Sequence, residues 1–187
     1  MIIEDKNINA HNFTEVMNLS KVFENCTFSN CNFNNFNCNH YQFLDCNFHS
    51  CDWSNVQIHQ TQFANVQFID CKMIGLTFAH CNTFGLSLQF DNCKIDHSNF
   101  YKLKLNKTIF KKCSLKDVDF TDALLKEAKF YDCDLQQAVF FNTDLEKADL
   151  GTSYHLQIVP EQNKLKKTKF SNDNIRGLVA HLNIIID

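Results

Sequence analysis

The chain has 187 residues, a length that suits one domain better than two. It carries 18 Lys and Arg residues against 21 Asp and Glu residues, and the net charge of −3 excludes a protein that coats polyanions through general basicity. The 19 Phe residues exclude a disordered chain. No apolar run approaches the length of a membrane span, and Met1–Lys6 lacks the start of a signal peptide. We therefore expect a cytoplasmic protein whose ten Cys residues stay reduced.

Residues 1–20 share only part of the pattern that dominates the rest of the chain. Ile8 and Phe13 fit the spacing found downstream, but Asn18 does not. We expect an irregular N-terminal coil or cap over residues 1–20.

From residue 21 to residue 152 the sequence repeats every five residues. One position of each quintet is large and apolar, with Cys38 as the exception, and the position two before it is mostly Cys, Ala, Ser, Thr or Val. The frame shifts once, by two residues, within residues 82–88. The large positions are Phe23, Phe28, Phe33, Cys38, Phe43, Phe48, Trp53, Ile58, Phe63, Phe68, Met73 and Phe78, then Phe90, Ile95, Phe100, Leu105, Phe110, Leu115, Phe120, Leu125, Phe130, Leu135, Phe140, Leu145 and Leu150.

Neither regular backbone suits a period of five. In an α-helix five residues turn by about 500°, so the apolar side chains would spread around the cylinder. In a flat strand an odd repeat would change faces at every step. A chain that turns a corner every five residues solves both problems, because each quintet then points one small and one large side chain inward. Four such sides make a square coil of about 20 residues, and the coils stack about 4.8 Å apart as a β-solenoid.

Stacking predicts which residues meet. Residues one coil apart lie above one another, and the step is longer by two positions across the frame shift. We interpret that shift as a bulged corner over residues 82–88 rather than a domain boundary. One expected ladder is Phe28, Phe48, Phe68, Phe90, Phe110 and Phe130.

Quintets such as Cys26–Asn30, Ala123–Glu127 and Ala148–Thr152 follow the order small, polar, Phe or Leu, polar, polar. This order resembles the pentapeptide repeat family, and the resemblance extends over residues 21–152. It implies an all-β fold, a right-handed quadrilateral β-helix.

The C-terminal segment, residues 153–187, resembles the cap of the quinolone-resistance (Qnr-type) and microcin-immunity subfamily. Ser171 is a good N-cap, and apolar residues at helical spacing predict a short α-helix over residues 172–182, with Asn183 as its C-cap. The resemblance implies a head-to-head homodimer through this segment; the alternative is a cap that only covers the last coil. The expected interface residues are Ile175, Leu178, Leu182 and Ile184.

Members of that subfamily bind type II topoisomerases and resemble a DNA duplex in shape and charge. The resemblance therefore implies a non-enzymatic DNA mimic that binds DNA gyrase or topoisomerase IV as a competitor or protector. The alternative is a scaffold for a different protein. Residues 1–100 carry 9 acids and 4 lysines, whereas residues 101–187 carry 12 acids and 14 basic residues, so the acidic half is N-terminal.

Acids without an opposing lysine in the next coil are the candidates for contact with a cationic partner. We expect Asp122, Glu127 and Asp132 to be matched by lysines one coil earlier, which disfavours direct nucleic-acid binding by the lysine run over residues 102–116. By the same step Lys126 should lie beside Glu146, Lys129 beside Asp149, and Glu127 also beside Lys147. The expected free acids, and so the candidate partner-binding residues, are Asp45, Asp52, Asp70, Asp117, Asp119, Asp134 and Asp144.

No motif indicates catalysis or a cofactor. The Cys residues occupy the small inward position, where a thiol behaves as a small hydrophobe, and their spacing is not that of a zinc site. We expect no enzyme activity, no cofactor and no metal site.

Overall fold

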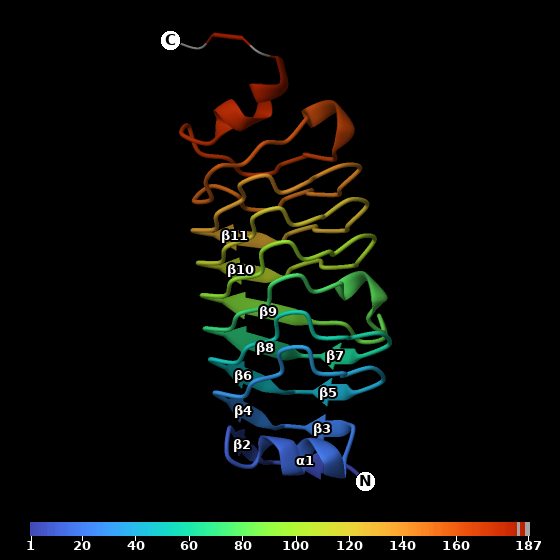
Figure 1. Cartoon of the computed structure of the whole chain (residues 1–187). Helices are drawn as coiled ribbons and strands as arrows, with labels where there is room; N and C mark the ends of the chain where they lie inside the picture. Colours follow the sequence, from blue (N-terminus) through green and yellow to red (C-terminus); the bar gives the residue numbers. More distant parts are fainter. Residues whose placement is uncertain (183, 186–187) are drawn as a thin grey trace.

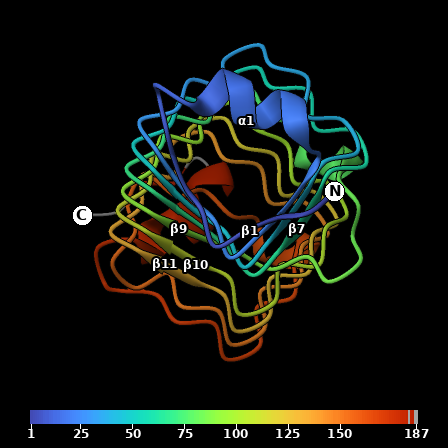
Figure 2. The same ribbon diagram turned by 90° about the horizontal axis from the view of Figure 1, so that it is seen from below.

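The computed structural model describes residues 1–182 and 184–185. The backbone winds as one continuous coil from α1 to the C-terminal cap (Figure 1). Viewed along its axis, the coil has a roughly square outline (Figure 2). This is the expected quadrilateral β-solenoid. Among the described residues, no helix is long and apolar enough to cross a membrane.

Two sides of the coil form parallel sheets. Sheet A has the order β1-β3-β5-β7, and sheet B has the order β11-β10-β9-β8-β6-β4-β2. The other two sides are joined by isolated parallel bridges, such as Asp52↔Lys72 and Asn99↔Asp119. The strands are β1 (Ile3–Glu4), β2 (Asn7–Asn9), β3 (Val22–Glu24), β4 (Thr27–Ser29), β5 (Gln42–Leu44), β6 (Asn47–His49), β7 (Gln62–Ala64), β8 (Val66–Ile69), β9 (Leu88–Asp91), β10 (Ile109–Lys111) and β11 (Lys129–Tyr131).

The register confirms the predicted ladder. Phe28 pairs with Phe48 and Phe48 with Phe68, each at the regular step of one coil. Between β8 and β9 the step is longer by two positions, so that Phe68 pairs with Phe90. The extra length bulges outward between Cys81 and Leu88, and sheet B continues past it without a break.

The period of five has a backbone cause. The residue two after the large side chain adopts the left-handed conformation in nearly every quintet, as at Lys102, Lys107 and Lys112, with φ of 61°, 63° and 53°. The exceptions are His80 and Thr152. One left-handed residue per quintet turns the chain through a corner. Asn and Asp, which tolerate this conformation best among non-glycine residues, occupy many of these corners.

The interior is a column of stacked rings. The Phe110 ring is fully buried, and its centroid lies 5.1 Å from that of Phe90 and 4.9 Å from that of Phe130, with nearly parallel planes. Phe100 and Phe120 approach the same ring edge-on, at 6.1 and 5.9 Å. Offset stacking along the axis and edge contacts across it fill the coil with favourable aromatic geometry.

The N-terminal coil contains a helix that the repeat pattern did not predict. Residues 1–9 are regular, because β1 and β2 pair with β3 and β4. Helix α1 (Phe13–Leu19) then replaces the next part of the coil. Its Phe13 packs edge-on against Phe33 at 4.6 Å, and the Tyr41 hydroxyl donates a hydrogen bond to the Met17 carbonyl at 3.1 Å. The helix thus closes the N-terminal end of the aromatic column.

The C-terminal cap differs from the predicted α-helix over residues 172–182. It consists of two 3₁₀ turns, Ile175–Leu178 and Ala180–Leu182, after a further 3₁₀ turn at Pro160–Gln162. The tighter turns hold the cap against the last coil, since the Asn174 amide donates to the carbonyls of Leu150 and Ser153 at 2.6 and 3.1 Å. The Ser171 hydroxyl accepts the Asn174 N–H at 3.2 Å, but this bond lies in the turn that precedes the cap, because Asn174 and not Ser171 is the N-cap of the first 3₁₀ turn. The expected Asn183 C-cap lies outside the described residues.

Candidate protein-binding surfaces

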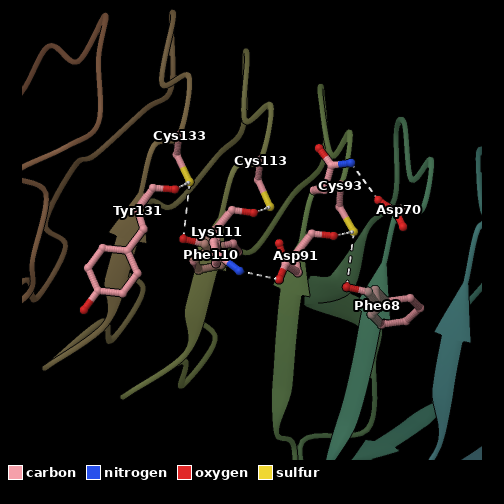
Figure 3. Close-up of polar contacts among 10 residues, drawn as sticks. Phe68, Asp70, Asp91, Cys93, Phe110, Lys111, Cys113, Tyr131 and Cys133 are labelled. Atoms are coloured by element: carbon pink, nitrogen blue, oxygen red, sulfur yellow. Dashed lines mark hydrogen bonds and ion pairs between the residues drawn. The ribbon is translucent and has the colours of Figure 1, made fainter.

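Inward and outward side chains form separate columns along the rod. Figure 3 shows the thiols of Cys93, Cys113 and Cys133 in one row just past the ends of β9, β10 and β11, and the outward pair Lys111 and Asp91 beside them. The Cys93 thiol donates to the carbonyls of Phe68 and Asp91, both at 3.4 Å. The Lys111 ammonium lies 2.8 Å from the Asp91 carboxylate of the previous coil. Inward columns supply the core, so binding chemistry belongs to the outward ones.

All ten Cys residues are buried and unpaired in disulfides. Burial raises the pKa of Cys46 to about 12. The hydrogen bond with Cys31, together with burial, raises the pKa of Cys51 to about 12. Thiols held protonated in this way are poor nucleophiles and poor metal ligands. Within the described residues, no group of three His, Cys, Asp or Glu side chains is arranged to hold a metal ion.

The expectation of free charge is wrong for three of the seven candidate acids. Asp52 pairs with Lys72 at 3.3 Å, directly across one coil step. Asp134 pairs with Lys116 at 3.1 Å, and Asp144 pairs with Lys126 at 3.5 Å. These last two lysines lie on the diagonal of the ladder rather than directly opposite, and their long side chains reach across it.

Asp134 and Asp144 are also buried, with 8% and 4% of their surface exposed, which makes them unsuitable for partner contact. Burial raises the pKa of Asp134, but hydrogen bonds from His155 and Lys116 outweigh it, and the net pKa is lowered. The Asp134 charge is therefore compensated by side chains of the same chain.

The acids expected to be matched are only partly so. Glu127 pairs with Lys147 of the next coil at 3.9 Å, and Lys126 pairs with Glu146 at 3.4 Å, as the coil step predicts. Asp122 accepts a hydrogen bond from the Asn142 amide at 2.6 Å, while the Lys102 ammonium lies 4.7 Å above the Tyr101 ring. No ion pair joins Lys112 to Asp132 among the described residues, and Asp149 pairs with Lys169 at 3.4 Å.

Corner aspartates are satisfied by asparagine amides instead, a feature that the lysine-based analysis missed. The Asn65 amide donates to Asp45 at 2.7 Å, and the Asn92 amide donates to Asp70 at 2.6 Å. Asn25 donates in the same way to Asp5 at 2.6 Å. An amide fixes the carboxylate but leaves its negative charge uncompensated. The recurrence of Asp and Asn at equivalent corners of successive coils would have revealed these pairs.

The structure does not bring the four remaining candidate acids together. Asp45 and Asp70 are exposed at the two corners that flank sheet B. Asp117 is exposed on a different edge, 3.6 Å from His97. Asp119 lies on the side opposite sheet B and accepts the Asn99 amide at 3.2 Å. Of the seven predicted residues, Asp45 and Asp70 alone border one surface.

The surface at the Asp45 corner of sheet B is hollowed. A shallow cleft of about 480 Å³ runs along this corner, and its lining is mostly polar. Residues 22–71, which supply most of it, contain no Lys or Arg. We call the outward face of sheet B with its two flanking corners, over residues 22–71, the acidic face. The side chains that line the cleft include Glu24, Asn25, Asp45, Asn47, Asn65, Gln67 and Gln89.

The C-terminal end carries exposed apolar side chains. Three of the four expected dimer-interface residues are exposed, as contact with a second chain requires. They are Ile175 at 50%, Leu182 at 54% and Ile184 at 57%. Leu178 behaves differently, because it is half-buried and packs against the core. Leu178 therefore holds the cap to its own coil, and the other three remain available.

The model of the pentapeptide repeat region matches residues 21–89 and 86–156. The chain belongs to the pentapeptide repeat family. A comparison with curated protein sequences finds no match.

Among solved structures, the pentapeptide repeat rod is similar to a trypsin-treated variant of QnrB1, a plasmid-mediated fluoroquinolone resistance protein. The TM-score is 0.65 at 17% identity, over 100% of this chain and 98% of that one. A second trypsin-treated QnrB1 variant gives 0.64 at 17% identity, over 100% and 99%. HetL, a pentapeptide repeat protein involved in heterocyst differentiation regulation in the cyanobacterium Nostoc, gives 0.44 at 10% identity, over 90% and 84%.

Proposed function

We propose that this pentapeptide repeat protein binds a type II DNA topoisomerase, with DNA gyrase as the first candidate and topoisomerase IV as the second. It acts without catalysis, as a rod that competes with DNA or protects the enzyme. The observation that carries the proposal is the acidic face, where Asp45 and Asp70 flank sheet B in a stretch without Lys or Arg. Negative charge at both edges of one face of a rod is what a DNA-binding cationic groove recognises.

The likeness to a trypsin-treated QnrB1 variant extends over 100% of this chain and supports the choice of shape. We further propose a head-to-head homodimer through Ile175, Leu182 and Ile184. That arrangement places one acidic face at each outer end of the dimer. Each gyrase contact then involves the N-terminal half of a rod, away from the lysine-rich coils.

The decisive experiment is direct binding to purified gyrase, followed by a supercoiling assay with and without a quinolone. We compare the wild type with the double variant Asp45→Asn and Asp70→Asn. The matched control is Asp117→Asn with Asp119→Asn, which removes the same charge from other sides of the rod. We expect the first variant to lose at least about tenfold in affinity, the control to bind normally, and wild-type affinity to fall with salt.

Equal loss in both double variants would show that net charge, not the acidic face, governs binding. No binding to gyrase or topoisomerase IV at low salt, with a folded protein in the same sample, would refute the proposal. A scaffold for a different protein would then replace it.

A further inference from the structure

Exposed apolar side chains gather at one corner of the rod. Away from the two ends, the described residues include six large apolar side chains that are exposed, and five of them lie on two adjacent sides, the one opposite sheet B and the one that continues sheet A, or at the corner between them. Phe84 is the most exposed of these, at 78%, and Phe141 is 51% exposed. Single exposed apolar residues need no explanation, but their concentration at one corner does. The five are Phe84, Tyr101, Leu124, Val139 and Phe141.

The ladder makes this group continuous. Lys104 is bridged to Leu124 of the next coil, and Asp119 is bridged to Val139. By the same register Tyr101 and Phe141 stand two coils apart in one outward column. The bulged corner over residues 82–88 places Phe84 at the N-terminal end of the group, and its chain neighbours Thr83 and Gly85 share a cleft with Lys102 and Lys104.

A cleft of about 440 Å³ opens beside Phe84. Lys102 and Lys104 form one wall of this cleft, and Gly85 and Leu86 of the bulge form the other. Among the described residues, neither lysine forms an ion pair with a carboxylate, unlike Lys111 and Lys116 further along the chain. The cleft therefore carries positive charge, and the exposed Phe84 ring belongs to the bulge whose Thr83, Gly85 and Leu86 line it.

We propose that this corner, which we call the Phe84 corner, binds an acidic protein segment that also carries apolar side chains. Its carboxylates enter the cleft and pair with Lys102 and Lys104. Its apolar side chains cover Phe84 and Leu124. The charge is opposite to that of the acidic face, so this surface takes a different partner and does not depend on the proposed function.

Two observations favour a protein over a nucleic acid. Leu124 and Val139, unlike the three aromatic members of the group, are aliphatic and offer no stacking platform, so a strand of stacked bases would leave them uncovered. Asp119 and Asp122 also lie along the same side, and their charges would repel a continuous phosphate chain while leaving room for an uncharged stretch of peptide.

The test is a selection of random peptides of moderate length, displayed on phage, against the wild-type protein. A peptide made from the enriched sequence is then titrated by fluorescence anisotropy. The cleft variant combines Lys102→Glu, Lys104→Glu and Phe84→Ser. The matched control combines Lys166→Glu and Lys167→Glu, an exposed lysine pair that also forms no ion pair among the described residues. Circular dichroism verifies that all three proteins are folded.

We expect enriched peptides that contain Asp or Glu together with aromatic or aliphatic residues. Their affinity should fall at least about tenfold in the cleft variant and stay within about twofold in the control. Enrichment of basic or uncharged peptides, or equal loss in both variants, would overturn the proposal. So would tighter binding of a labelled oligothymidylate than of the selected peptide, which would assign the corner to a nucleic acid.

Discussion

Gly177 of the cap lies directly against the backbone carbonyl of Leu156 in the last coil. A Cβ atom at position 177 would overlap that carbonyl oxygen, which is backbone and has no rotamer to escape into. The Gly177 carbonyl in turn accepts the Ile158 N–H at 3.2 Å. This close approach is what docks the 3₁₀ turns on the rod.

Gly177→Ala should therefore lift the cap away from the last coil. We expect a loss of about 1–3 kcal/mol in the free energy of unfolding, because the overlap forces the backbone to shift. The matched control is Gly151→Ala, where the added Cβ meets a side-chain oxygen of Asp149 at 3.3 Å. Thermal unfolding measures both, and equal midpoints for the two variants would contradict the packing described here.

Phe110→Ala should cost about 3–5 kcal/mol, because it leaves a cavity inside the aromatic column. The control is Phe141→Ala, which removes the same ring from an outward position that is 51% exposed. We expect the control to change stability by less than about 0.5 kcal/mol. Urea denaturation followed by circular dichroism decides between them, and similar costs would mean that the inward and outward assignments are wrong.

The buried thiols should make the rod sensitive to alkali. The pKa of Cys46 rises from 9.0 to about 12 on folding, so the unfolded chain releases its proton first as the pH rises. Stability is thus fully present below pH 9 and declines between pH 9 and 12, by about 1.4 kcal/mol per such thiol at one pH unit above the unfolded value. In Cys46→Ala the free energy of unfolding should decline less steeply as the pH rises above 9. Urea titrations at a pH below and a pH above the unfolded pKa measure this decline. A wild-type midpoint that stays constant over that range would speak against protonated, buried thiols.

Because the thiols are buried, we also expect them to react slowly with thiol reagents. In native buffer most of the ten thiols should resist a disulfide reagent and react only after denaturation. Prompt reaction of six or more would contradict the inward columns.

Lys107→Asn should stabilise the rod. Lys107 adopts φ of 63°, a conformation that costs less for Asn than for Lys, and we expect a gain of up to about 1 kcal/mol. Lys166→Asn removes the same charge from an exposed position outside the left-handed corners and should bring no gain. Thermal midpoints for the pair test this, and a gain at both positions would point to charge rather than backbone conformation.

Leu182→Asp should abolish the proposed homodimer. Residue 182 is 54% exposed in the single chain, so the change leaves the fold intact but desolvates a carboxylate at the interface. Sedimentation should then show monomers for the variant and dimers for the wild type. Wild-type monomers at micromolar concentration would refute dimerisation through this end.

The sequence predicts the interior of the rod far better than its surface. Inward positions such as Phe68 and Phe90 follow from periodicity alone, because the coil leaves each of them one neighbour above and one below. Outward partners do not follow from the coil step, since a long lysine such as Lys126 reaches diagonally to Asp144. Hydrogen bonds such as that from the Asn65 amide to Asp45 are predictable only when side-chain geometry is known as well as register. The two ends depart from the repeat, so the period of five predicts neither α1 nor the cap. The apolar spacing in the cap predicts an α-helix, whereas its contacts with the last coil, such as that of Asn174 with Leu150, accompany 3₁₀ turns.

Helix α1 also limits the addition of further strands to the N-terminal end of the rod. Each coil offers the next one a complete set of parallel backbone donors and acceptors, so an uncovered end is a template for further growth. With Phe13 seated on Phe33, α1 removes that template from the part of the N-terminal coil that it replaces, while β1 and β2 remain the edge strands of the two sheets. A chain that lost this helix would present a bare aromatic stack to any other strand, and its natural fate would be fibre assembly rather than simple unfolding.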